Sequence, residues 1–191
     1  MLNTTLSRIR RNHGLEHATI HVLSQTHNNF SAQGNSDHRG FSLNVYGDVS
    51  EADVQKAVKT ALTRLQGGEH QLAVHPNCGT VLLTTATLAT LAGQAVFGIE
   101  LKRSGQEKMD LYTLLNVLPT AVLAAVAAII VSRPLGIHLQ ATYTVEGDPG
   151  QLAVRSVRQV TPSLVGRLFQ LLLTGNNPNL QANSYRIETV G

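Results

Sequence analysis

A row of histidines within residues 4–26 offers side chains that bind transition metals. His13, His17 and His21 are spaced by four residues, so they lie along one face of a helix. Two imidazoles one helical turn apart can share one metal ion, and histidine is largely neutral near pH 7. Glu16 stands beside this row, where a carboxylate can take a proton from a metal-bound water or orient a ligand. We therefore expect His13 and His17 to be metal ligands and Glu16 to be a catalytic base.

A second pair of ligand types, His75 and Cys78, lies in a turn before a long uncharged segment. A thiolate combined with imidazoles is a donor set that zinc favours. If this turn faces the first helix, His13, His17, His75 and Cys78 complete a tetrahedral zinc site. Three protein ligands and a water, with Glu16 nearby, would instead make a catalytic site. The alternative is that these histidines are ordinary surface or hydrogen-bonded side chains and that the turn only starts a helix.

Two segments, 79–99 and 111–132, carry no charged residue. A helix rises about 1.5 Å per residue, so each segment could cross a hydrocarbon core about 30 Å thick. We expect a transmembrane helical hairpin over 79–132, with membrane lipid as its partner. The alternative is a soluble protein with two long buried helices.

Two arguments bear on the orientation of the hairpin in the membrane, and they point in opposite directions. The loop between the segments contains Lys102, Arg103 and Lys108, and the positive-inside rule would place this loop in the cytoplasm. Exporting the folded, histidine-rich N-terminal part without a signal sequence would be costly, however. We expect an inner or cytoplasmic membrane location with both termini in the cytoplasm.

The polar parts on either side of the hairpin, residues 1–78 and 133–191, predict one α+β domain built from both ends of the chain. Ser50 and Asp53 have the spacing of a capping box at a helix start, and Gly67 ends that helix. The other expected elements are helices at 4–26 and 161–175 and strands at 28–33, 41–46, 70–75, 138–145, 151–160 and 184–190.

Composition excludes several classes of protein. Charged residues make up 14% of the chain, against about 25% in a typical soluble domain, so a disordered, highly charged chain is excluded. A single cysteine excludes an internal disulfide framework. Aromatic residues are 4% of the chain, Trp is absent and the basic residues are scattered, so we expect no nucleic-acid partner. We expect the basic residues Arg8, Arg10 and Arg11 to contact lipid headgroups or solvent.

The segment His13-Gly14-Leu15-Glu16-His17 resembles the His-x-x-Glu-His signature of the inverted zinc peptidases. This resemblance implies that His13 and His17 are zinc ligands and that Glu16 is the general base of a hydrolase. That family also needs a glutamate ligand on a later helix. Neither Glu51, at the start of a helix, nor Glu69, after its end, lies in a copy of that element.

Three segments, 12–19, 40–49 and 73–80, resemble a family of small bacterial membrane proteins of unknown function, and the resemblance covers most of the chain. It implies a two-span architecture and no particular activity. Two functions remain open besides that of a small-molecule or tetrapyrrole binder with the histidine row as axial ligands. One is an integral membrane protein with a His/Glu/Cys metal site at the membrane surface, holding zinc and acting as a metal-dependent hydrolase. The other is a non-catalytic assembly or scaffolding protein of a membrane complex, or of a homo-oligomer.

Overall fold

The computed structural model describes residues 2–105, 110–162 and 182–191. The chain divides into two compact units, one formed by Met1–His75 with Ala141–Gly191 and the other by Pro76–Gln140. The first unit combines helices with a sheet, and the second contains two long helices. The predicted α+β class is confirmed.

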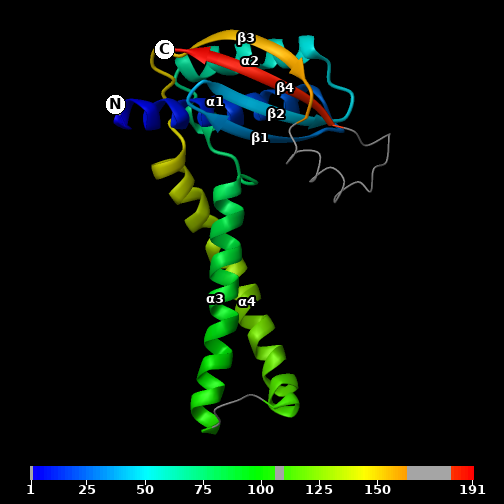
Figure 1. Ribbon diagram of the computed structural model, residues 1–191, viewed down its shortest axis with the longest axis vertical. Helices are drawn as coiled ribbons and strands as arrows, with labels where there is room; N and C mark the ends of the chain where they lie inside the picture. Colours follow the sequence, from blue (N-terminus) through cyan, green and yellow to red (C-terminus); the bar gives the residue numbers. More distant parts are fainter. Residues whose placement is uncertain (1, 106–109, 163–181) are drawn as a thin grey trace. The chain divides into compact units, whose positions relative to one another are not determined.

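The first unit contains a four-stranded antiparallel sheet with the strand order β1-β2-β4-β3 (Figure 1). Its strands are β1 (Ser31–Asp37), β2 (Gly40–Tyr46), β3 (Ala153–Val160) and β4 (Ala182–Val190). β2 pairs with β4, so that Phe41 lies opposite Ile187. The two ends of the chain therefore belong to one sheet.

Two helices, α1 (Leu2–Thr26) and α2 (Glu51–Gln66), cover one face of this sheet (Figure 1). Apolar side chains that alternate along β2 and β4 point toward the helices and are fully or almost fully buried, namely Phe41, Leu43, Val45, Tyr185 and Ile187. Burying each such side chain stabilises the fold by about 1.5–3 kcal/mol. The predicted capping box is present at the start of α2, where Ser50 and Asp53 bond each other's backbone N–H groups.

α1 is the central helix of the unit, because the sheet and α2 both pack against it and the short 3₁₀ helix η1 (His70–Ala73) does as well. Between Asn12 and Leu23 almost every residue of α1 is buried, the polar side chains of Glu16, His17 and Thr19 among them. Buried polar groups need partners, so these side chains are held in defined positions.

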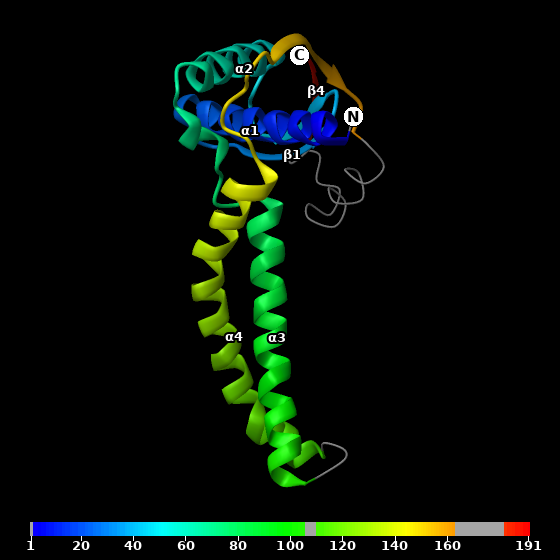
Figure 2. The same cartoon turned by 90° about the vertical axis from the view of Figure 1, so that its left-hand side faces the viewer.

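The second unit is a hairpin of α3 (Gly79–Ser104) and α4 (Leu111–Leu139), which lie side by side (Figure 2). Both helices are long and apolar enough to cross a membrane. A Cβ atom at Gly136 would lie 2.9 Å from the Cα atom of Val81, so the glycine permits close packing of the two helices. The Ser132 hydroxyl donates a hydrogen bond to Thr85 Oγ1 at 2.9 Å.

Two strands expected from the sequence are absent from the described residues around them. Instead of a strand at 138–145, α4 continues to Leu139 and a π-helical turn, η2 (Gln140–Thr144), follows. The apolar alternation there does not mark a sheet face, because Tyr143 is exposed while Val145 is buried in the core. Instead of a strand at 70–75, the chain forms η1. The helix expected at 161–175 falls mostly outside the described residues.

Two of the basic residues near the start of α1 have partners within their own unit, and nothing in the structure tests the expectation that these residues contact lipid headgroups or solvent. Arg10 donates hydrogen bonds to the carbonyl oxygens of Thr142 and Val145, both at 3.0 Å. Arg11 forms an ion pair with Glu146 at 3.0 Å. These contacts hold both η2 and the segment after it against α1.

Candidate metal centre

Four imidazole rings lie next to one another in the first unit, three on α1 and one just after η1. The ring centroids of His13 and His17 are 4.4 Å apart, those of His17 and His75 are 5.8 Å apart, and those of His21 and His75 are 5.0 Å apart. We call these four residues the histidine cluster. The row predicted on α1 and the separate His75 are therefore brought together.

Backbone carbonyls fix which ring nitrogen of His13 and His17 carries the proton. His13 Nδ1 lies 2.9 Å from the carbonyl oxygen of Thr144, and His17 Nδ1 lies 2.7 Å from that of Ala73. A carbonyl oxygen only accepts hydrogen bonds, so in both rings Nδ1 is the protonated donor. Nε2 then carries the lone pair that a metal requires. Histidine ligands in metalloproteins usually have this arrangement, with one nitrogen on the metal and the other N–H on a carbonyl or carboxylate.

A glycine between His13 and His17 makes the contact of His13 with Thr144 possible. A Cβ atom at Gly14 would lie 2.5 Å from the carbonyl oxygen of Glu146. The Glu146 N–H also donates to the carbonyl oxygen of Arg10 at 3.0 Å. The segment that follows η2 therefore passes directly over α1 at Gly14, which brings the Thr144 carbonyl to His13.

The two other imidazoles of the cluster have different surroundings. His21 donates from Nε2 to the carbonyl oxygen of Val74 at 2.9 Å, so its lone pair is on Nδ1. Burial, together with the nearby His17 and His21 rings, lowers the pKa of His75 to about 4. His75 is therefore a neutral imidazole at pH 7, which is the form that binds metals.

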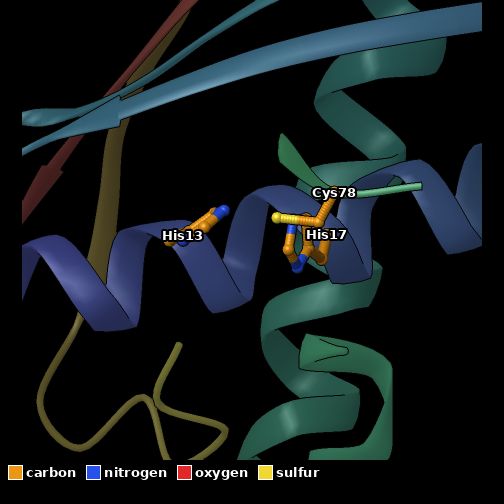
Figure 3. Close-up of side chains that lie close together, drawn as sticks. All are labelled: His13, His17 and Cys78. Carbon is orange, nitrogen blue, oxygen red and sulfur yellow. The ribbon is translucent and has the colours of Figure 1, made fainter. Parts of the chain in front are cut away.

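Cys78 precedes the first residue of α3 and follows His75 by three residues. Its sulfur, one ring nitrogen of His13 and one of His17 all lie within 4.8 Å of one another (Figure 3). Two imidazoles and a thiol at this separation are of a kind that binds zinc, although bonds of about 2.0–2.3 Å would require the three atoms to move closer to a common centre.

Glu16 lies on α1 between His13 and His17 in sequence but does not belong to the group of three residues that could hold a metal ion. Its side chain is buried, and its carboxylate accepts a hydrogen bond from the Ser36 hydroxyl on β1 at 2.5 Å. The two later glutamates are also engaged elsewhere. Glu51 accepts from the Gln159 N–H at 2.9 Å, and Glu69 forms an ion pair with Arg64 at 2.6 Å.

Several residues that hold the centre in place were not found from the sequence. The carbonyl groups of Ala73, Val74 and Thr144 orient the histidines, but a backbone carbonyl leaves no signal in residue type. Gly14 is visible within the His-x-x-Glu-His pattern, yet its role depends on a chain segment more than a hundred residues later.

The chain therefore combines an α+β domain, in which four histidine rings lie together, with a hairpin of two apolar helices. Residues 8–157 match the family described as a domain of unknown function (DUF6391), and the chain belongs to this family. This agrees with the predicted resemblance to an uncharacterised family.

An uncharacterised protein from Picosynechococcus sp. (strain ATCC 27264 / PCC 7002 / PR-6) is 40% identical over 99 residues, which are 47% of this chain and 47% of the relative. The chain thus spans about half the length of this curated relative. No solved structure matches the chain.

Proposed function

We propose that this chain is a membrane-anchored protein that binds one zinc ion or a similar transition-metal ion. The ligands are Nε2 of His13, Nε2 of His17 and the thiolate of Cys78, and His75 or a water molecule completes the tetrahedron. The observation that carries the proposal is the orientation of His13 and His17, whose Nδ1 atoms are both bound to backbone carbonyls. In both rings Nε2 is then the nitrogen that would bind the ion.

The place of Cys78 in the ligand set is supported by the chain itself as well as by the separation of the ligand atoms. His75 lies beside His17, and only Pro76 and Asn77 separate it from Cys78. A three-residue step spans at most about 10 Å, so the thiol cannot be far from the cluster. A thiolate beside a bound cation has a lowered pKa and is a strong zinc ligand.

Membrane anchoring rests on the hairpin. The side chains of α3 and α4 that face outward include many large apolar groups, among them Leu83, Leu123 and Ile130, each about 70% exposed. Exposing so large an apolar surface to water is unfavourable, whereas the hydrocarbon core of a bilayer accommodates it. We place the metal centre at the membrane surface because Cys78 directly precedes α3, and we place both termini in the cytoplasm.

The proposal extends to metal binding and not to hydrolysis. A general base must reach the water that it deprotonates, and the carboxylate of Glu16 is held by Ser36 on β1. A bound zinc ion would in this case stabilise the unit, since binding to the folded state alone shifts the folding equilibrium.

Metal analysis of the full-length protein, purified in detergent, tests the site. We expect about one zinc ion per chain in the wild type, as a single tetrahedral site predicts. His17→Ala and Cys78→Ser should lose it, whereas His38→Ala, which removes an exposed turn histidine, should keep it. A wild-type protein without stoichiometric metal, or equal metal in all four proteins, would disprove the site.

Membrane extraction tests the anchoring independently. The protein should stay in the membrane fraction after washing with alkaline carbonate and should leave it only with detergent. A tag on the C-terminus should be protected from protease added outside intact spheroplasts. Release by carbonate would refute the membrane anchor. Cleavage of the tag would show that the C-terminus lies outside the cytoplasm, opposite to the orientation proposed.

A further inference from the structure

The side chain of Glu16 is built into the contact between α1 and β1. It is 4% exposed, and its carboxylate oxygen accepts the hydrogen bond from Ser36. A Cβ atom at Gly34 of β1 would overlap this carboxylate, so the side chain occupies the space that the glycine leaves open. The fit is specific: one strand supplies both a hydroxyl donor and a gap at the position of the carboxylate.

A second contact of the same kind lies one helical turn earlier. Asn12 donates from its side-chain amide to the carbonyl oxygen of Asp37 at the end of β1 at 2.8 Å. The hydroxyl of Thr189 on β4 donates to Asn12 Oδ1 at 2.7 Å. Asn12 and Glu16 thus fix both the rotation and the axial position of α1 against the sheet.

The two proposed imidazole ligands lie on the same stretch of α1. His13 and His17 flank Glu16 in sequence and use the adjacent helix face. Zinc–nitrogen bonds are about 2.0–2.1 Å long, so a shift of α1 by a fraction of an ångström would be felt at the metal.

We propose that Glu16 is a positioning residue of the metal centre: by locking onto Ser36 and Gly34 of β1, it holds α1 where His13 and His17 converge on one ion. This inference rests on the metal site proposed above. It gives the glutamate of the His-x-x-Glu-His pattern a role through the protein scaffold, in place of a role in proton transfer.

Binding of Co²⁺ to the full-length protein in detergent tests this role, because the visible absorption of Co²⁺ reports the geometry of its ligands as well as affinity. Gly34→Ala should weaken binding about 10-fold or more, the usual effect of disturbing the outer shell of a site, and should change the spectrum. Ser36→Ala should act in the same direction. The neighbouring Gln33→Ala on exposed β1 surface is the matched control and should bind as the wild type does.

Glu16→Gln separates positioning of the helix from direct ligation of the metal. The glutamine oxygen can still accept the hydrogen bond from Ser36, so Co²⁺ affinity and spectrum should stay close to those of the wild type. In a Glu16→Ala protein the space next to Gly34 is free, and adding Gly34→Ala should then cost little more. Such non-additivity is the signature of a direct contact.

The outcomes distinguish the two proposals. Wild-type protein that takes up no Co²⁺ would overturn the metal site and this role with it. Co²⁺ binding that is normal in both Gly34→Ala and Ser36→Ala would overturn the positioning role alone. So would a loss in Glu16→Gln as large as that in His17→Ala, since it would make the carboxylate a metal ligand.

Discussion

The Nδ1 atom of His17 lies 2.7 Å from the carbonyl oxygen of Ala73, and both residues are buried. This hydrogen bond joins the central helix α1 to the last residue of η1 and fixes the tautomer of the imidazole. It therefore has two consequences, one for the fold without metal and one for the metal itself.

Replacing His17 by alanine should destabilise the protein even when no metal is present. The variant leaves the Ala73 carbonyl buried without its donor, which costs about 1–3 kcal/mol. Chemical unfolding in detergent with a chelator would measure the loss. The exposed His38→Ala variant should match the wild type. Equal stability of all three proteins would show that the hydrogen bond contributes nothing to the fold.

Gly14→Ala should affect metal affinity although residue 14 carries no ligand. The new Cβ atom would meet the Glu146 carbonyl oxygen at 2.5 Å, so the segment after η2 must move away from α1. We expect a stability loss of about 1–3 kcal/mol, as for other overpacked sites. His13 would lose its contact to Thr144, and zinc affinity should fall with it.

A glycine with free space around it provides the comparison for Gly14→Ala. A Cβ atom at Gly98 of α3 would meet nothing within 4 Å, so Gly98→Ala should leave both stability and metal binding unchanged. The interpretation of Gly14 is untenable if both alanine variants bind zinc as tightly as the wild type does.

Much of the fold could be predicted because local patterns determine its elements. The capping box of Ser50 and Asp53, the apolar alternation of Phe41, Leu43 and Val45, and the two uncharged segments each have one dominant structural interpretation. The prediction of a strand at 138–145 was wrong, because an alternation of apolar residues over so few positions does not distinguish a strand from the end of a long helix.

The candidate centre was only partly predictable for a different reason. The spacing of His13 and His17 is a local property of α1, so their common face followed from the sequence. The contacts of Thr144 and Ala73 with these rings depend on tertiary packing across long sequence separations. Glu16 belongs to the His-x-x-Glu-His pattern, yet its carboxylate is oriented by a hydrogen bond from Ser36 on β1, which the pattern does not contain.

Ser50→Ala should destabilise α2 by about 1 kcal/mol, because the helix loses a side-chain cap. The hydrogen bonds from Ser50 lower the pKa of Asp53. A carboxyl whose pKa is lower in the folded state stabilises the fold above its unfolded pKa of about 3.9 and loses this effect as the pH falls below it. The difference between Ser50→Ala and the wild type should therefore shrink in acid. A difference that grows below pH 4 would contradict the capping contact.

The metal-free protein should lose stability as the pH falls from neutral toward about 4, and His75 should be one cause. The pKa of His75 is about 4 in the folded protein, below the ordinary value of 6.5, because burial disfavours the charged ring and His17 and His21 lie beside it. Between these two values the unfolded chain binds more protons at this residue than the folded protein does. The contribution of the neutral His75 ring to the free energy of unfolding is therefore fully present above pH 6.5. It declines as the pH falls toward 4, because protonation favours the unfolded chain.

Thermal unfolding of the full-length protein in a chelator, measured from pH 7 to pH 4.5, would follow this decline. His75→Gln keeps a polar side chain of similar reach but cannot be protonated, so its unfolding temperature should vary less over the same interval. His70→Gln replaces a histidine outside the histidine cluster and is the matched control, which should retain the wild-type slope. If His75→Gln and the wild type fall in parallel, the His75 ring does not resist protonation in the folded protein.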